Sequence, residues 1–176
     1  GINMGFGNVI GDASRIHLDS DGSGALNIGI ESGPGSLNDR GVIYIDSRPG
    51  GFSSTVSFTD NADQLRAAIS ALASDGSGNR ADITFASGFE ADFAIGFEAG
   101  FAGVWELMLG GSHTFVANAN LTPSGSPTSQ YFEMNLTLAD LGIGSGDSFN
   151  YVITYLNSFS AYRSDEFHGV SCQSVV

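Results

Sequence analysis

Lysine is missing from this chain altogether. Its basic residues are six arginines, which stand against nineteen acidic residues and leave a formal net charge of −13. So acidic a protein gains nothing from counterion release on DNA or RNA, and anionic membrane surfaces repel it. A phosphate-binding P-loop is excluded too, because that motif needs a lysine. The partners left open are neutral polymers such as glycans, calcium, and further copies of the chain.

Cysteine is almost absent as well. Cys172 stands alone, so the chain cannot form an internal disulfide. Two interpretations of this thiol remain open: a small buried hydrophobe, or an intermolecular or reactive thiol. No apolar run approaches eighteen residues, so we expect no membrane insertion. Only 14% of the residues are charged, and the resulting surface of Ser, Thr, Asn and Gly predicts a secreted, extracellular protein.

Motifs of catalysis are also lacking. Ser112 follows Gly110 but precedes Thr114, so it does not complete the Gly-x-Ser-x-Gly turn of hydrolases. The histidines His17, His113 and His168 are spread along the chain without metal-ligand spacing. The acidic residues that come nearest to a cluster are Glu90, Asp92, Glu98 and Glu106. Their positions on alternating strands favour a solvent-exposed acidic face over a catalytic pair of carboxylates. We therefore expect a protein that is not an enzyme.

What the sequence does contain is alternation of apolar and polar residues with period two, separated by turn residues. This pattern predicts an all-β, antiparallel two-sheet sandwich formed by a single domain over residues 1–176. The predicted strands are 26–30, 42–45, 93–97, 105–109, 132–136 and 149–156.

Two helical segments interrupt the strands. Residues 60–73 place Leu65, Ala68, Ile69 and Leu72 at helical spacing, which predicts one short crossing α-helix capped by Thr59 or Asp60. A single turn is predicted at 138–141, capped by Thr137 and closed by Gly142.

One loop carries a pattern typical of cation sites. In residues 19–24, Asp19, Asp21 and Ser23 place oxygen side chains at the first, third and fifth positions, and a glycine ends the run. The closing acid of an EF-hand is missing, because Ile30 occupies the twelfth position. A calcium-binding turn and a plain hairpin turn both remain open.

The aromatic residues bear on carbohydrate binding. The chain has thirteen Phe, five Tyr and one Trp, whereas sugar platforms favour Trp and Tyr for their polar edges. Trp105 alternates with apolar neighbours, so a core position and a ligand platform both remain open for it. Tyr131, Tyr155 and Tyr162 are predicted to be exposed. The candidate ligand-binding residues are Trp105, Tyr131 and Tyr155. Asn120 and Asn135 stand in glycosylation sequons.

Several segments together resemble DOMON-like secreted β-sandwich modules, which include carbohydrate-binding modules of the ninth family. The resemblance spans roughly residues 24 to 158 and is carried by 42–46 with Gly50-Gly51, 89–95, 132–136, 138–142, 146–149 and 152–155. It implies a jelly-roll-like sandwich of two antiparallel sheets. Members bind sugars, haem or calcium, or act as accessory domains. The sugar-binding members clamp their ligand between aromatic residues, usually Trp, whereas this chain has a single Trp.

These observations lead to two hypotheses. The first is a secreted, non-catalytic structural or adhesive subunit that associates with other copies of itself through edge strands. The alternative is a carbohydrate-binding module that binds extracellular polysaccharide, supported by calcium. Repeating contacts between copies that bury more than roughly 1,000 Å² would favour the first hypothesis. An aromatic-lined groove left open would favour the alternative.

Overall fold

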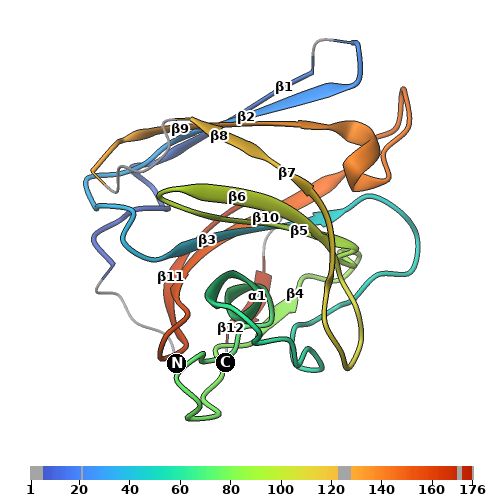
Figure 1. Ribbon diagram of the computed structural model, residues 1–176. Helices are drawn as coiled ribbons and strands as arrows, with labels where there is room; N and C mark the ends of the chain where they lie inside the picture. Colours follow the sequence, from blue (N-terminus) through green and yellow to red (C-terminus); the bar gives the residue numbers. More distant parts are fainter. Residues whose placement is uncertain (1–5, 21, 123–127, 170–171, 176) are drawn as a thin grey trace.

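The computed structural model describes residues 6–20, 22–122 and 128–169, together with the backbone of 172–175. Two antiparallel sheets make a sandwich, as the period-two alternation predicts. Figure 1 shows the four-stranded sheet above the six-stranded sheet, with a short helix and a small two-stranded sheet below both.

The four-stranded sheet has the order β1-β2-β9-β8. Its strands are β1 Arg15–Ser20, β2 Ala25–Glu31, β9 Tyr131–Thr137 and β8 Asn120–Thr122. In β9 the exposure alternates residue by residue: Phe132, Met134 and Leu136 are buried and the residues between them are exposed. One face of this sheet therefore packs on the core and the other faces solvent.

The six-stranded sheet has the order β11-β10-β3-β5-β6-β7. Its strands are β11 Tyr162–Gly169, β10 Asn150–Asn157, β3 Arg40–Asp46, β5 Phe93–Glu98, β6 Phe101–Glu106 and β7 Thr114–Asn118. The third sheet pairs β12 Cys172–Val175 with β4 Ile83–Phe85.

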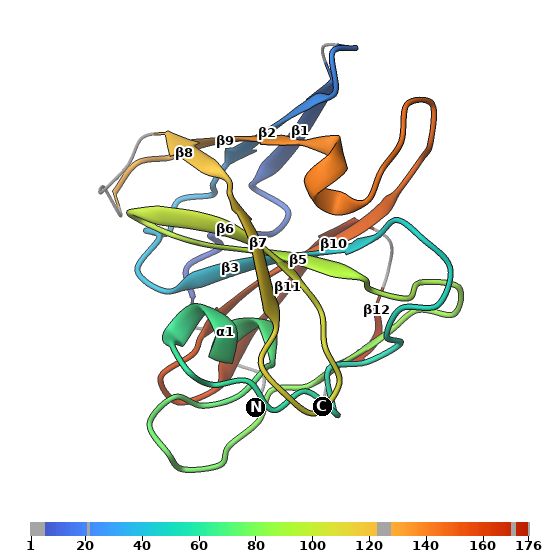
Figure 2. The same cartoon turned by 45° about the vertical axis from the view of Figure 1, so that its right-hand side comes forward.

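The six-stranded sheet separates two hydrophobic cores. Ile43 and Ile95 belong to the core between the two large sheets, whereas Val42, Tyr44 and Ala94 belong to a second core under the helix and β4. The run 42–45 is apolar on both faces because both faces of β3 are buried, one in each core. Figure 2 shows α1 and β12, the strand that pairs with β4, below the sheet.

The crossing helix is shorter than the sequence predicts. α1 covers Gln64–Ile69 and its N-cap is Asp63, whose side chain accepts a hydrogen bond from the backbone N–H of Arg66. The predicted cap Asp60 is instead buried, with its carboxylate bound to the backbone N–H groups of Ala62 and His113. The predicted extension to residue 73 is wrong because Ala71 takes a left-handed conformation with φ of 56°.

Two other local predictions have opposite outcomes. The turn η1, Leu138–Leu141, has the predicted Thr137 cap and ends at Gly142, whose φ is 66°. The strand predicted at 105–109 is displaced: β6 ends at Glu106, and Leu109 is 66% exposed in the turn that follows.

Candidate functional site

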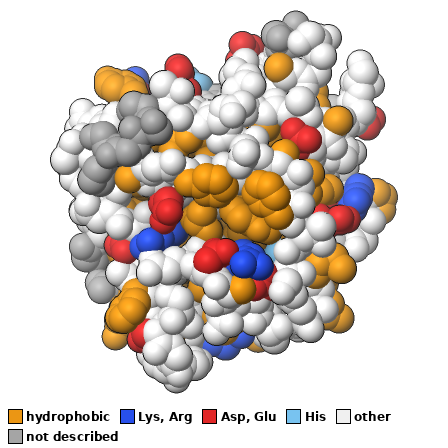
Figure 3. Space-filling view, viewed as in Figure 1, with side chains coloured by type: hydrophobic (Ala, Val, Ile, Leu, Met, Phe, Trp, Pro, Cys, Tyr) orange, Lys and Arg blue, Asp and Glu red, His pale blue; other side chains and the backbone are white. Residues whose placement is uncertain are grey.

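An aromatic groove of about 540 Å³ lies where α1 meets the outer face of the six-stranded sheet. Figure 3 shows hydrophobic side chains gathered in the middle of the surface that faces the viewer in Figure 1, with acidic and basic side chains beside one another next to them. The residues that line the groove are Arg40, Asp63, Gln64, Leu65, Arg66, Glu98, Phe101, Trp105, His113 and Phe115.

Three aromatic rings from two neighbouring strands form the apolar part of the groove. The ring of Trp105 lies 5.4 Å from Phe115 and 6.4 Å from Phe101, centroid to centroid, with interplanar angles of 71° and 67°. Such edge-to-face packing is favourable for aromatic pairs. Trp105 is only 5% exposed, whereas Phe101 is 38% and Phe115 is 50% exposed. The tryptophan therefore forms the floor, and the phenylalanines offer the accessible surface.

Gly103 lets the three rings converge. A Cβ at this position would lie 2.9 Å from Trp105, 3.0 Å from Phe115 and 3.1 Å from Phe101. Contacts this short force neighbouring atoms to move, and these neighbours are three rings that already touch. A side chain at position 103 would therefore push the aromatic rings apart.

Two ion pairs flank the rings. The Nε of Arg40 lies 3.0 Å from a carboxylate oxygen of Glu98, across the neighbouring strands β3 and β5. At the start of α1, the Nε of Arg66 donates to Asp63 at 2.7 Å. Burial alone would raise the pKa of Asp63, but the hydrogen bonds from Arg66 outweigh it and lower the pKa. Each acid of the groove is thus matched by an arginine.

His113 forms an inner wall of the groove and is only 3% exposed. Its Nδ1 accepts a hydrogen bond from the backbone N–H of Met108 at 3.1 Å, and its Nε2 lies 2.9 Å from the hydroxyl of Ser70. Because Nδ1 accepts, the proton of the neutral ring sits on Nε2 and is donated to Ser70. The pair therefore lacks the basic nitrogen that would activate a serine, and it ties the β6–β7 loop to the end of α1.

Burial also sets the charge state of His113. Desolvation lowers its pKa, Arg66 lowers it further, and Asp60 acts in the opposite direction. The imidazole is therefore kept neutral at neutral pH.

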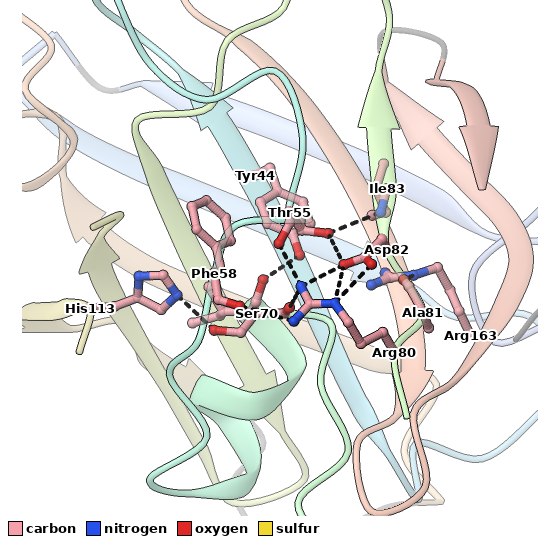
Figure 4. Close-up of polar contacts among 11 residues, drawn as sticks. Tyr44, Thr55, Phe58, Ser70, Arg80, Ala81, Asp82, Ile83, His113 and Arg163 are labelled. Atoms are coloured by element: carbon pink, nitrogen blue, oxygen red, sulfur yellow. Dashed lines mark hydrogen bonds and ion pairs between the residues drawn. The ribbon is translucent and has the colours of Figure 1, made fainter. Parts of the chain in front are cut away.

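Arg80 and Asp82 hold the loops behind α1 in place (Figure 4). The guanidinium donates to both oxygens of Asp82 and to the carbonyl oxygens of Thr55, Phe58 and Ser70. One arginine thereby connects the residue just before β4, the loop before α1 and the end of α1. Charge-assisted bonds of this kind are stronger than neutral ones, so the network stabilises the wall that carries Asp63 and Arg66.

A second Ser–His contact joins β11 to the segment before β1. The Nε2 of His168 lies 2.6 Å from the hydroxyl of Ser14 and 2.8 Å from the carbonyl oxygen of Gly11. A carbonyl oxygen only accepts, so the contact with Gly11 requires a proton on Nε2. This histidine too is unsuited to deprotonate its serine.

The carboxylates singled out in the sequence are each matched by an arginine, apart from Glu90. Arg48 lies between Asp92 and Glu106, with its Nε 3.5 Å from Asp92 and its NH2 bound to Glu106. Asp92 is 3% exposed and also accepts from the backbone N–H of Ser47 and Arg48. The expectation of a solvated face is therefore wrong for Asp92.

The three predicted ligand-binding residues lie in different parts of the structure. Trp105 lies in the groove, but the prediction of an exposed Tyr155 is wrong, because it is 1% exposed in the core between the sheets. Its hydroxyl accepts from the backbone N–H of Asp39 at 2.7 Å, and burial raises its pKa to about 12. Tyr131 is 63% exposed on β9, in the other sheet, and Tyr162 is 48% exposed at the start of β11.

The predicted calcium turn is only partly described. Asp19 belongs to β1 and pairs with Asn27, so it lies in a strand and not in a loop. Asp21 lies outside the described residues, and Ser23 follows in the turn between β1 and β2. Within the described ranges, no group of three His, Cys, Asp or Glu side chains is arranged to hold a metal ion. The calcium site stays a prediction.

Phe101 and Phe115 are the aromatic residues of the groove that the sequence analysis does not predict. Phe101 stands four residues before Trp105, so in a strand the two side chains point to the same face, and this spacing is the one local signal for Phe101. Phe115 joins them through strand pairing with Trp105, which no local pattern reveals.

In the part of the chain that the structure describes, no helix has the length and apolar character to span a membrane. The chain matches no protein-family model, no curated protein and no solved structure. The resemblance to DOMON-like modules therefore stays a prediction.

Proposed function

We propose that this protein is a non-catalytic β-sandwich module that binds neutral carbohydrate in the aromatic groove. The observation that carries the proposal is the convergence of Phe101, Trp105 and Phe115 between two ion pairs. A sugar ring has an apolar C–H face that packs on aromatic rings, and hydroxyl groups that both donate and accept hydrogen bonds. The groove supplies a partner for each.

The size and chemistry of the groove fit this class of ligand. Ligand sites are typically apolar clefts of about 300–1,000 Å³ with a few polar groups that fix orientation, and the groove measures about 540 Å³. Its ion pairs offer guanidinium donors from Arg40 and Arg66 and carboxylate acceptors from Glu98 and Asp63.

Charge favours a neutral sugar over an acidic one. The two arginines of the groove are matched by two carboxylates, and the whole chain carries a formal charge of −13. A uronic-acid polymer would meet repulsion from the protein as a whole without a surplus arginine to bind it.

The single tryptophan makes the groove directly observable. Trp105 is the only tryptophan of the chain, so its fluorescence reports on the floor of the groove alone. Titration with soluble neutral polysaccharides (a β-glucan, a xylan and a galactomannan), with polygalacturonate as the acidic comparison, is expected to change the emission for a neutral polymer only.

Phe115→Ala should weaken that binding about tenfold, since losing one aromatic contact costs roughly 1.4 kcal/mol on this scale. Phe159→Ala is the matched control, because Phe159 is 55% exposed in the turn between β10 and β11 and does not line the groove. If no neutral polymer changes the Trp105 emission, or if the two variants bind alike, the groove is not a sugar site.

The described edge strands of the two large sheets support self-association less than the groove supports carbohydrate binding. Arg15 and Asp19 place charges on β1, β8 is only three residues long, and Val116 forms a bulge in β7. Asp165 and Glu166 place charges on β11. All of these are ways in which proteins protect edges against strand addition. Self-association and extracellular location stay predictions, and light scattering at high concentration tests the first.

A further inference from the structure

The outer face of the four-stranded sheet carries two rows of polar positions. Strand register aligns Asp19, Asn27, Asn135 and Asn120 in one row across all four strands. The next row along the strands consists of His17, Gly29, Glu133 and Thr122. These eight residues line a shallow depression of about 390 Å³, here called the polar trough, together with backbone atoms of the strands between.

Gly29 creates the depression in the middle of the second row. The position of its missing Cβ lies 3.4 Å from the Cβ of His17 and 3.8 Å from the Cδ2 of the ring. The side chain of His17 therefore packs against the backbone of Gly29, its partner across the β1–β2 pair. A side chain at position 29 would occupy the space that the trough now offers.

The amides of the first row are oriented by one another. The Nδ2 of Asn135 donates to the Oδ1 of Asn27 at 2.7 Å. An amide side chain carries two N–H donors and an oxygen with two lone pairs. This one bond therefore fixes the direction of both groups and leaves each of them with further donor and acceptor capacity toward a ligand.

We propose that the polar trough is a second carbohydrate-binding surface, which takes an extended, hydroxyl-rich neutral glycan chain lying across the strands. Neighbouring strands are about 4.7–4.9 Å apart, close to the length of one pyranose residue in an extended chain. Successive sugar residues would thus lie over successive strands, where each meets an amide or carboxylate of the first row.

The charges of the trough select among polymers. Among the described residues that line it, the acidic ones are Asp19 and Glu133, and none is an arginine. An anionic polysaccharide, a nucleic acid or a second copy of this acidic chain would be repelled. The hydroxyl groups of a neutral glycan can donate to the two carboxylates, and can donate to or accept from the amides and His17.

The trough and the aromatic groove lie on the outer faces of two different sheets. Both sheets and the core between them separate the two sites, as the layers in Figure 1 show. A module with two separate sites connects two polymer chains or two segments of one chain, and gains avidity from simultaneous binding. This bridging rests on the proposed function of the groove, whereas binding in the trough does not.

The test uses gel retardation and turbidity with hydroxyethylcellulose and a soluble mannan, with chitosan and polygalacturonate as cationic and anionic comparisons. Gly29→Gln fills the trough, and the double variant Asn27→Ala/Asn135→Ala removes its amide pair. Asn118→Ala is the matched control, because Asn118 is an exposed strand asparagine that lines neither site. Thermal melting checks that each variant folds.

We expect both trough variants to bind a neutral polymer about tenfold more weakly and to lose turbidity, a change of roughly 1.4 kcal/mol. Phe115→Ala should also lose turbidity but keep the retardation that depends on the trough. If both folded trough variants are retarded like the Asn118→Ala control, the trough is not a binding surface. If only chitosan is retarded, the assignment to neutral glycans is overturned.

The two proposals fail in different ways. Retardation that survives Phe115→Ala and disappears in Gly29→Gln supports the trough and contradicts the groove. The reverse pattern supports the groove and contradicts the trough.

Discussion

Trp105 and Phe115 pair in register across β6 and β7, with their ring centroids 5.4 Å apart. The pair joins a buried ring to an exposed one. A ligand that contacts Phe115, as proposed, would therefore change the surroundings of the only tryptophan of the chain. Optical measurements on the native protein can follow most of the predictions below.

Gly103→Val should disrupt the groove. The added side chain would clash with Trp105, Phe101 and Phe115, so we expect the free energy of unfolding to decrease by about 1–3 kcal/mol. We also expect the fluorescence emission of Trp105 to shift to the red. Urea unfolding followed by fluorescence measures both. Gly111→Ala is the control, because a Cβ there has nothing within 4 Å. Equal stability of the two variants would contradict the role of Gly103.

Asp63→Ala should loosen α1. It removes the N-cap bond to Arg66 and the ion pair, and loss of such a cap costs about 0.5–2 kcal/mol. Asp63→Ser keeps a capping oxygen and removes the charge, so its free energy of unfolding should stay within a few tenths of a kcal/mol of the parent. If serine destabilises as much as alanine, the ion pair and not the cap stabilises the helix.

The stability of the fold should fall on the acid side because of His113. Its pKa is lowered in the folded protein, so between the ordinary value of 6.5 and the lower folded value the unfolded chain binds more protons. The free energy of unfolding should therefore decrease as the pH falls below about 6.5, and level off once the folded state is protonated too.

Urea unfolding at a series of pH values checks this. His113→Gln should flatten the decrease, whereas His17→Gln, at an exposed histidine on β1, should retain it. An unchanged slope in His113→Gln would show that other groups cause the acid sensitivity.

Tyr155 should make the fold sensitive to alkali. Its pKa is raised to about 12 from an ordinary value of 10.0, so the unfolded chain loses its proton first. Stability is then fully present below about pH 10 and is lost as the pH rises toward 12.

Tyr155→Phe should remove this alkaline loss. At neutral pH it should cost about 1–3 kcal/mol, because the backbone N–H of Asp39 loses its acceptor. Tyr131→Phe, at an exposed tyrosine, is the control and should change neither quantity. Chemical unfolding from pH 8 to 11.5 measures both effects.

Much of the fold could be predicted because its signals are local. Alternation in 132–136 depends only on which residues are apolar, and the structure confirms it in β9. The turn at η1 was predictable because Thr137 and Gly142 lie next to the helix they delimit. The start of α1 was misjudged because Asp60 and Asp63 are equivalent as capping residues in sequence, and burial beside His113 decides between them.

The site could be predicted only in part. Trp105 was a candidate on composition alone, but Tyr155 shows the limit of that reasoning. Whether an aromatic residue in a strand is exposed depends on what covers its face, and β10 is covered on the face that carries Tyr155. The partners of Trp105 come from strand pairing, and the ion pairs from strands and a helix whose approach no local pattern encodes.

The amino-acid sequence alone determined the charge of −13, the expectation that polyanionic partners are repelled, the alternation seen in β9 and the caps of η1, since these depend on composition or on neighbours along the chain. Only the tertiary structure decided which rings converge over Gly103, which arginine neutralises which carboxylate, and which polar residues line the trough around Gly29. The reason is physical: grooves and cross-strand rows arise from register and packing between segments distant in sequence, and the free energy that selects them belongs to the whole fold.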